Sequence, residues 1–179
     1  MNQIQVLDKT FEVYLDASTI QKRVQEMAQQ ISSDLNGERP LFLSILNGSF
    51  LFTADLIRHL TLEPELSFIK LASYKGMRST GSITTAIGLD VDLAGRDVVL
   101  LEDIVDTGNT LFQFLPYLHQ QQPRSVRIAT LLHKAEATVH PLKLDYVGFV
   151  IPNKFVVGYG LDYDGWGRQH NAIYQLVVR

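Results

Sequence analysis

The chain has 179 residues, of which 46% are hydrophobic and 20% are charged, and its formal net charge is −3. These values are typical of one globular domain, here residues 1–179; they exclude a disordered or fibrous chain and do not favour nucleic-acid binding. The sequence has no cysteine for a disulfide or thiolate site, no apolar run near the ~20 residues of a membrane span and no secretory pattern at its start, so we expect a cytoplasmic protein that binds neither nucleic acid nor a membrane.

The first half of the chain alternates between amphipathic and apolar segments. Ser18, with Gln21 three residues later, resembles a capping box, and apolar residues at helical spacing follow it. The apolar run 41–46 then predicts a buried strand. After this strand, Ser49 is placed to cap a second helix that continues to about His59. A helix, a strand and another helix are therefore expected in this order.

The same alternation continues towards the C-terminus. Further strands are predicted at 66–73, 98–101, 125–132 and 146–151. A helix is predicted from about Thr110, and Pro116 should kink it or begin a new one. Buried strands that alternate with amphipathic helices indicate an α/β fold with a mostly parallel, twisted sheet flanked by helices. Ligands of such sheets bind at the carboxyl ends of the strands.

The most informative segment follows the apolar strand predicted at 98–101. Glu102 and Asp103 are adjacent carboxylates, and Asp106 is a third. Clustered carboxylates repel each other and are costly to desolvate, so a divalent cation, ligand hydroxyls or backbone N–H groups must compensate them. The turn 107–110 supplies such N–H groups at the positive end of a helix, where anions bind. The segment therefore predicts a sugar-phosphate site, although a solvated acidic turn is the plainer alternative.

This segment resembles the phosphoribosyl-pyrophosphate motif of type I phosphoribosyltransferases, in particular the form found in hypoxanthine–guanine phosphoribosyltransferases. The resemblance implies a parallel sheet with a small hood and a flexible active-site loop. It implies that Glu102 and Asp103 hold the ribose hydroxyls and take part in magnesium binding, and that Asp106 is the general acid/base at purine N7. It also implies that the 5′-phosphate is bound by Thr107, Gly108, Asn109 and Thr110.

Two earlier segments occupy family positions. Leu46, Asn47 and Gly48 form a plain turn when considered alone, but they match the place where the family binds pyrophosphate, often through a cis peptide. Many relatives carry Lys or Arg in place of Asn47, so the pyrophosphate contact here must come from the backbone or from another residue. Ser73 and Tyr74 open a polar, glycine-containing stretch that matches the family's flexible lid; the alternative is a disordered connection.

The C-terminal third carries the residues that the resemblance assigns to the purine and the pyrophosphate. Lys134 would donate to the 6-oxo group of the purine, because an ammonium only donates hydrogen bonds. Phe155 would stack on the base, and the backbone of Val156 would bind its edge. Asp162 would hold a second magnesium ion, and Arg168 would contact pyrophosphate. Without the resemblance, Lys134 is a surface lysine and Phe155 fits a core position equally well.

Two remaining features carry no assigned role. The segment 164–167 departs from the usual family sequence, which leaves the shape of this loop open. No metal-ligand spacing is found among the five histidines, which we expect at the surface or in loops: His59, His119, His133, His140 and His170.

The expected function is purine salvage. A magnesium-dependent transferase would combine phosphoribosyl pyrophosphate with a 6-oxopurine, form IMP or GMP, release pyrophosphate, and assemble as a homodimer or homotetramer. One alternative is a nucleotide-sensing, RNA-binding regulator on the same scaffold, which needs a basic face that a net charge of −3 does not favour. A phosphate-accepting receiver domain also clusters acids at strand ends, but it lacks the phosphate-binding turn. The choice among hypoxanthine, guanine and xanthine stays open.

Overall fold

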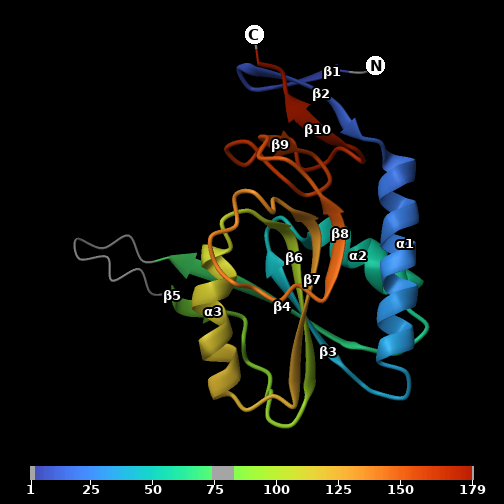
Figure 1. The fold of residues 1–179 in the computed structure, drawn as a ribbon, viewed down its shortest axis with the longest axis vertical. Helices are drawn as coiled ribbons and strands as arrows, with labels where there is room; N and C mark the ends of the chain where they lie inside the picture. Colours follow the sequence, from blue (N-terminus) through green and yellow to red (C-terminus); the bar gives the residue numbers. More distant parts are fainter. Residues whose placement is uncertain (1–2, 74–82, 179) are drawn as a thin grey trace.

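Two sheets organise the molecule, for which the computed structural model describes residues 3–73 and 83–178 (Figure 1). The larger sheet has six strands in the order β5-β4-β3-β6-β7-β8. Its strands are β3 (Leu41–Leu46), β4 (Glu65–Ser73), β5 (Ile83–Ile87), β6 (Asp97–Val105), β7 (Ser125–His133) and β8 (Tyr146–Val150). Five of these strands, β4, β3, β6, β7 and β8, run parallel to one another. The edge strand β5 pairs with β4 in the antiparallel direction. The predicted mostly parallel sheet is therefore confirmed.

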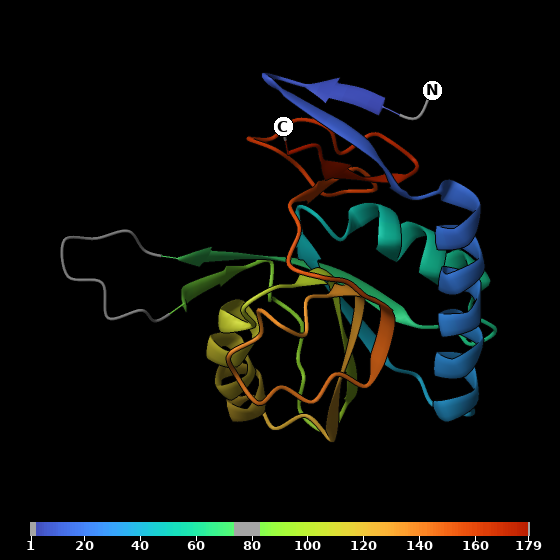
Figure 2. The ribbon, with the colours of Figure 1, turned by 45° about the horizontal axis from the view of Figure 1, so that its top comes forward.

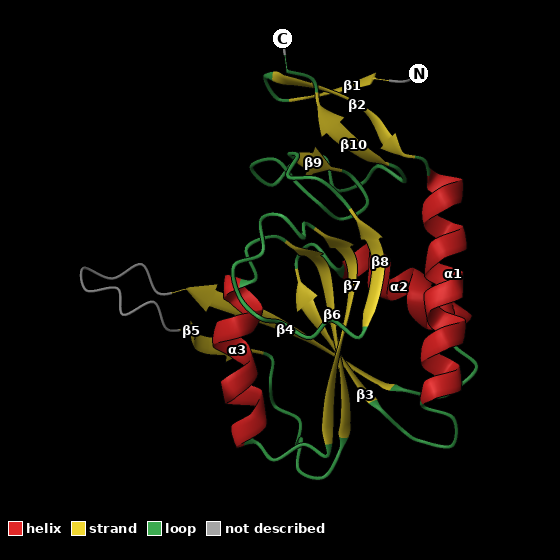
Figure 3. Ribbon diagram, viewed as in Figure 1, coloured by secondary structure: helices red, strands yellow, loops and turns green. Residues whose placement is uncertain are grey.

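Helices cover both faces of this sheet (Figure 3). The helices are α1 (Ala17–Asp34), α2 (Phe50–His59) and α3 (Asn109–Gln120). Phe42 and Val99 point to the face that packs against α1 and α2, whereas Leu43 and Leu100 point to the face that packs against α3. This alternation along each strand explains why the buried strands are apolar at consecutive positions. No helix in the described part of the chain is long and apolar enough to cross a membrane.

The smaller sheet forms a hood beside the carboxyl ends of the parallel strands (Figures 1 and 2). It contains β1 (Gln3–Val6), β2 (Lys9–Leu15), β9 (Val156–Val157) and β10 (Ile173–Leu176), in the order β1-β2-β10-β9. An apolar cluster of its own, which includes Phe11, Val157 and Tyr174, holds these strands together. The resemblance implied a hood, but hydrophobic patterning predicted none of its strands.

The predicted cap of α1 is wrong, and the predicted cap of α2 is right in position but not in its hydrogen bond. The α1 cap is Asp16, whose carboxylate accepts from the backbone N–H of Thr19 at 2.9 Å, and Ser18 donates to the same carboxylate. Ser49 occupies the cap position of α2 but makes no capping bond, because its hydroxyl donates to the carbonyl of Ile45 at 2.5 Å. A cap prediction from sequence cannot distinguish such competing backbone partners.

Two other boundaries also differ from the prediction. Strand β6 continues to Val105, because its ladder with β7 pairs Glu102 with Thr130 and Val105 with His133. The two leading acids therefore lie inside the strand rather than in a turn after it. Helix α3 runs through Pro116 to its end, so no new helix begins there. A proline removes one backbone hydrogen bond, and the packing of the buried side of α3 outweighs that loss.

Candidate active site

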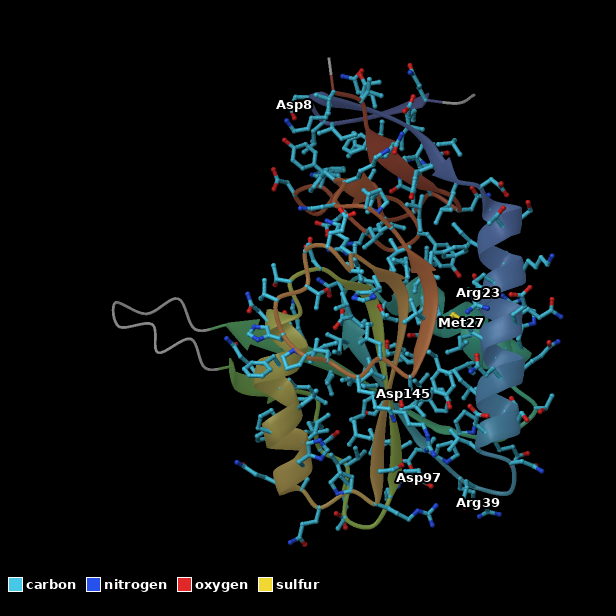
Figure 4. The ribbon with its side chains drawn as sticks, in the orientation of Figure 1. Asp8, Arg23, Met27, Arg39, Asp97 and Asp145 are labelled. Atoms are coloured by element: carbon cyan, nitrogen blue, oxygen red, sulfur yellow. The ribbon has the colours of Figure 1, made fainter. Side chains whose placement is uncertain are left out.

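The predicted site residues meet where the parallel strands end under the hood. Asp97 begins β6 at the far end of the sheet, and Asp8 lies in the hood at the opposite end of the molecule (Figure 4). Strand β6 therefore carries its acidic end towards the hood. The segments after β3, β6 and β7 reach the same edge, because parallel strands end at the same side of a sheet.

The first part of the site is the buried acid pair at the end of β6. Glu102 is 8% exposed, and its Oε2 atom has no hydrogen-bond partner among residues 3–73 and 83–178. Burial and the neighbouring charge of Asp103 raise the pKa of Glu102 well above its usual range, and burial raises the pKa of Asp103. A buried acceptor without a donor is unfavourable, so the pair suits a ligand that brings hydroxyl groups or a cation.

This acid pair predicts a pH-dependent stability. A raised carboxyl pKa means that the folded state holds its proton more tightly, so the free energy of unfolding falls as pH rises from the ordinary carboxyl pKa to the raised value. Glu102→Gln removes this loss and is expected to raise Tm at about pH 8, while Tm of variant and wild type converge near about pH 4. Thermal denaturation without magnesium measures both values. Glu63→Gln, at an exposed position, is the control; a pH-independent difference between Glu102→Gln and wild type would contradict the prediction.

The second part of the site is the turn between β6 and α3. Its pocket of about 100 Å³ is lined by Glu102, Ile104, Val105, Asp106, Thr107, Gly108, Asn109, Thr110 and Leu111. Gly108 precedes α3 with φ of 80°, a left-handed conformation that favours glycine. The first N–H groups of a helix have no partner within the helix and attract anions. All four residues predicted to bind the 5′-phosphate thus line one pocket.

The segment that follows β7 packs against this turn. The ammonium of Lys134, which is nearly buried, lies 2.7 Å from Oδ2 of Asp106. The Thr138 hydroxyl donates to the backbone carbonyl of Asp106 at 2.8 Å, and the Val139 N–H donates to the carbonyl of Thr107 at 3.1 Å. The structure therefore brings together the predicted purine-binding lysine and the predicted general acid/base, which are 28 positions apart in the sequence.

The third part of the site is the turn after β3. The peptide bond between Leu46 and Asn47 is cis, and the Asn47 side chain is exposed. Gly48 packs so tightly that a Cβ atom there would lie 1.6 Å from Oδ2 of Asp103. Gly160 approaches from the hood, and a Cβ atom on it would lie 2.0 Å from the carbonyl oxygen of Gly48. The predicted pyrophosphate turn is thus enclosed between the acid pair and the hood.

Arg168 and Asp162 form an ion pair beside this turn. The guanidinium of Arg168 donates to the carbonyl of Gly160 at 2.6 Å and lies 2.7 Å from Oδ1 of Asp162. Asp162 also accepts from the N–H of Gly165 at 2.6 Å. The Arg168 charge opposes, without overcoming, the burial that raises the pKa of Asp103. Arg168 therefore lies close enough to the acid pair to influence it.

The carboxylates fit magnesium only together with ligand oxygens. Within the described ranges, no three His, Asp or Glu side chains form a cluster that would hold a metal ion. Glu102 and Asp103 form one pair, and Asp162 forms an ion pair with Arg168. Magnesium usually combines one or two protein carboxylates with substrate phosphates and water. The partnerless Oε2 atom of Glu102 is consistent with such a shared site.

Two of the predicted purine-binding residues, Phe155 and Val156, lie in the hood. Phe155 is 44% exposed, and its ring packs edge-on against Tyr163 with 5.8 Å between centroids. Val156 lies in β9 opposite Gln175 of β10. Phe155 is therefore not a core residue, because it keeps a large part of its ring exposed at the edge of the hood.

The atypical segment 164–167 forms a tight hairpin turn. Tyr163 pairs with Trp166 in the antiparallel direction, and the residues between them, Asp164 and Gly165, both have positive φ. Two residues with positive φ are the mark of a type I′ hairpin turn, for which Asp-Gly is a preferred sequence. The turn leaves Trp166 65% exposed.

The predicted lid lies outside the described residues. Ser73 is the last residue of β4, where it pairs with Ile83 of β5. Tyr74 and the polar stretch 75–82 that follows it are not described. The predicted contribution of Ser73 and Tyr74 to substrate binding stays a prediction.

Sequence patterns missed one contact near the predicted pyrophosphate turn. The Tyr159 hydroxyl donates to Oδ2 of Asp55 on α2 at 2.6 Å, and burial and this carboxylate raise the pKa of Tyr159. The bond joins the hood to the helix that follows the cis peptide, next to the Gly160–Gly48 approach. These residues are 104 positions apart, so no local pattern indicates their contact.

Comparisons with known proteins identify relatives of this arrangement. A family model for the phosphoribosyl transferase domain matches residues 11–164. The chain is 36% identical to a hypoxanthine-guanine phosphoribosyltransferase of Aquifex aeolicus over 174 residues, which cover 96% of this chain and 98% of that protein. It is 34% identical to a hypoxanthine-guanine-xanthine phosphoribosyltransferase of Tritrichomonas foetus over 179 residues, covering 99% and 94%. A crystal structure of a hypoxanthine-guanine phosphoribosyltransferase from Bacillus anthracis superposes with a TM-score of 0.86 at 35% identity, covering 93% and 98%.

Proposed function

The chain belongs to the phosphoribosyl transferase family, and from this membership we propose that it transfers the phosphoribosyl group of phosphoribosyl pyrophosphate to hypoxanthine or guanine. The products are IMP or GMP and pyrophosphate. One observation carries the proposal: a buried acid pair, an anion-binding turn and a lysine–aspartate pair lie side by side at one edge of the sheet. A sugar diol, its 5′-phosphate and a purine need these three kinds of partner.

The phosphoribosyl group is held at two points. The carboxylates of Glu102 and Asp103 accept hydrogen bonds from the ribose hydroxyls, which supplies the donor that Oε2 of Glu102 lacks. The N–H groups and hydroxyls of residues 107–110 bind the 5′-phosphate at the start of α3. Two separate points of attachment fix the orientation of the sugar without contacting the anomeric carbon itself. They therefore reduce the entropic cost of bringing this carbon and the purine together.

The purine lies between the hood and the lysine–aspartate pair. Lys134 donates to the 6-oxo group, Phe155 packs on the face of the base, and the backbone of Val156 binds its edge. The purine N9 forms a bond to the anomeric carbon as the bond from that carbon to pyrophosphate breaks. Asp106 accepts the N7 proton as a general base, and the ammonium of Lys134 holds its carboxylate in place.

Pyrophosphate leaves on the side of the cis peptide. The backbone of residues 46–48 and the guanidinium of Arg168 bind it, which compensates for the missing positive charge at Asn47. A guanidinium has five N–H donors, so its contacts with Gly160 and Asp162 leave donors for phosphate oxygens. Glu102, Asp103 and Asp162 are the residues that would hold magnesium, and magnesium, when bound, offsets the charge of the leaving pyrophosphate.

An assay of nucleotide formation tests the proposed function. Hypoxanthine, guanine, xanthine and adenine are each mixed with phosphoribosyl pyrophosphate and magnesium, and the nucleotide products are separated. Hypoxanthine or guanine is expected to react, whereas adenine is not, because Lys134 cannot accept from a 6-amino group. Equal use of adenine would contradict the role of Lys134, and no product from any base would contradict the proposed function.

Several features of the proposal extend beyond the active site. A homodimer or homotetramer is supported by apolar side chains at the surface of β4, where Leu66 and Phe68 are 38% and 40% exposed. The cytoplasmic location stays a prediction. The RNA-binding alternative has no support in the comparisons, because the relatives described above are named as phosphoribosyltransferases.

A further inference from the structure

His140 contacts both the phosphate-binding turn, residues 107–110, and the first turn of α3. Its Nε2 atom lies 2.5 Å from Oδ1 of Asn109, which is exposed at the pocket. Its ring stacks on Phe112 in the first turn of α3, with 4.0 Å between the ring centroids and 6° between the ring planes. Both contacts are made to the turn and helix that form the pocket, so the ring is fixed relative to them.

The backbone of the same segment explains this fixed position. Thr138 and Val139 bond to the carbonyls of Asp106 and Thr107, so the segment follows the turn residue by residue until His140 reaches Asn109. Just beyond it, the Leu142 side chain fills the space beside Gly108, where a Cβ atom would lie 2.7 Å from its Cδ1. His140 is thus part of a segment held along its length against the phosphate-binding turn.

The chemistry of the two side chains sets the direction of the Asn109 amide. An asparagine amide has one oxygen that accepts and one NH₂ group that donates. An imidazole with a proton on Nε2, which is either the charged ring or the neutral Nε2–H tautomer, donates to Oδ1. The NH₂ group of Asn109 is then directed away from His140. The opposite amide orientation would place the oxygen, which repels anions, where the NH₂ group now lies.

We propose that His140 is a positioning residue for the 5′-phosphate: it holds the oxygen of Asn109 so that the Asn109 amide presents its N–H donors to the phosphate. This inference rests on the proposed function, because it requires the 5′-phosphate to bind at residues 107–110. It predicts an effect on substrates that carry this phosphate and none on the free purine base.

Two substitutions separate the hydrogen bond from the ring stacking. His140→Phe keeps an aromatic ring against Phe112 but removes the donor, and His140→Gln restores a donor without the ring. We expect His140→Phe to raise KM for phosphoribosyl pyrophosphate about three- to tenfold, the range of one lost hydrogen bond, with a smaller change in kcat. KM for the purine should not change, and His140→Gln should return KM for phosphoribosyl pyrophosphate to within about twofold of wild type.

Two controls test whether His140 acts through Asn109. Asn109→Ala is expected to raise the same KM, and the double variant should lose no more than Asn109→Ala alone, because the two side chains form one unit. His59→Phe, an exposed histidine at the C-terminal end of α2, should match the wild type. Additive losses in the double variant would overturn the coupling and with it the proposal.

Direct binding separates this inference from the proposed function. Calorimetry with GMP and with guanosine is expected to show that His140→Phe weakens GMP binding while guanosine binding stays the same. Equal weakening of both ligands, or an unchanged KM for phosphoribosyl pyrophosphate, would overturn the positioning role while the transferase function stands. If the wild type forms no nucleotide from any purine, the proposed function itself is wrong.

Discussion

Replacing Asp106 with Asn is expected to lower kcat by about 10²–10⁴-fold, the usual contribution of general acid–base catalysis. The asparagine amide keeps the shape of the side chain but cannot accept the N7 proton. The amide oxygen of Asn can still accept hydrogen bonds from Lys134 and from the purine N7–H, so KM for both substrates should change much less than kcat. Steady-state kinetics with hypoxanthine and phosphoribosyl pyrophosphate measure these constants.

A structural side effect of this substitution has to be separated from the chemical one. The nearly buried ammonium of Lys134 loses its charged partner in Asp106→Asn, which lowers stability. Lys134→Met removes that ammonium and keeps Asp106, so its Tm shows how much of the effect comes from the ion pair. A near-normal kcat in Asp106→Asn, at a temperature where the variant is folded, would show that Asp106 is not the general acid/base.

Replacing Gly48 with Ala is expected to reduce kcat/KM for phosphoribosyl pyrophosphate by about 100-fold, the cost of displacing a binding group by about 1 Å. The new methyl group would overlap Oδ2 of Asp103 at 1.6 Å and Cγ at 2.4 Å. These atoms belong to the Asp103 side chain, so either this carboxylate rotates out of the acid pair or the turn after β3 shifts. That turn is the proposed pyrophosphate site.

A second glycine provides the control for this prediction. Gly37→Ala lies after α1 with no atom within 4 Å of the added Cβ, so it tests the effect of losing a glycine without a collision. Its φ of 82° costs some stability in an alanine. It should lower Tm and leave kcat/KM unchanged. If Gly48→Ala retains wild-type kcat/KM, the close packing of this turn on the Asp103 carboxylate does not contribute to binding of phosphoribosyl pyrophosphate.

The sequence predicted the strands and helices that are determined by the pattern of residues within the element itself. The strands β3 and β6 are apolar at consecutive positions because both faces of the sheet are covered by helices, and α1 has one apolar stripe. Patterning did not predict β9 and β10 of the hood, because they have only two and four residues and β10 pairs with the distant strand β2. Phe11 of β2, for example, pairs with Leu176 of β10.

The same distinction applies to the site. The acids of β6 and the turn after them are contiguous, so the segment 102–110 alone was enough to predict that they line one pocket. The role of Lys134, which lies beside Asp106, was predicted only from the family resemblance. The close approach of Gly48 to Asp103 was predicted neither from the residue pattern nor from the resemblance. Contacts of this kind depend on the packing of separate strands, which a periodic pattern does not encode.

The pairing of β2 with β10 has a consequence for how the enzyme becomes active during folding. These strands lie about 160 positions apart, and β10 fills the place between β2 and β9. Closing so long a loop is slow compared with forming the local strand–helix units of the central sheet. If Phe155 and the backbone of Val156 bind the base as proposed, we therefore expect base recognition to be gained late in refolding, after the central sheet with the proposed sugar-phosphate site has formed.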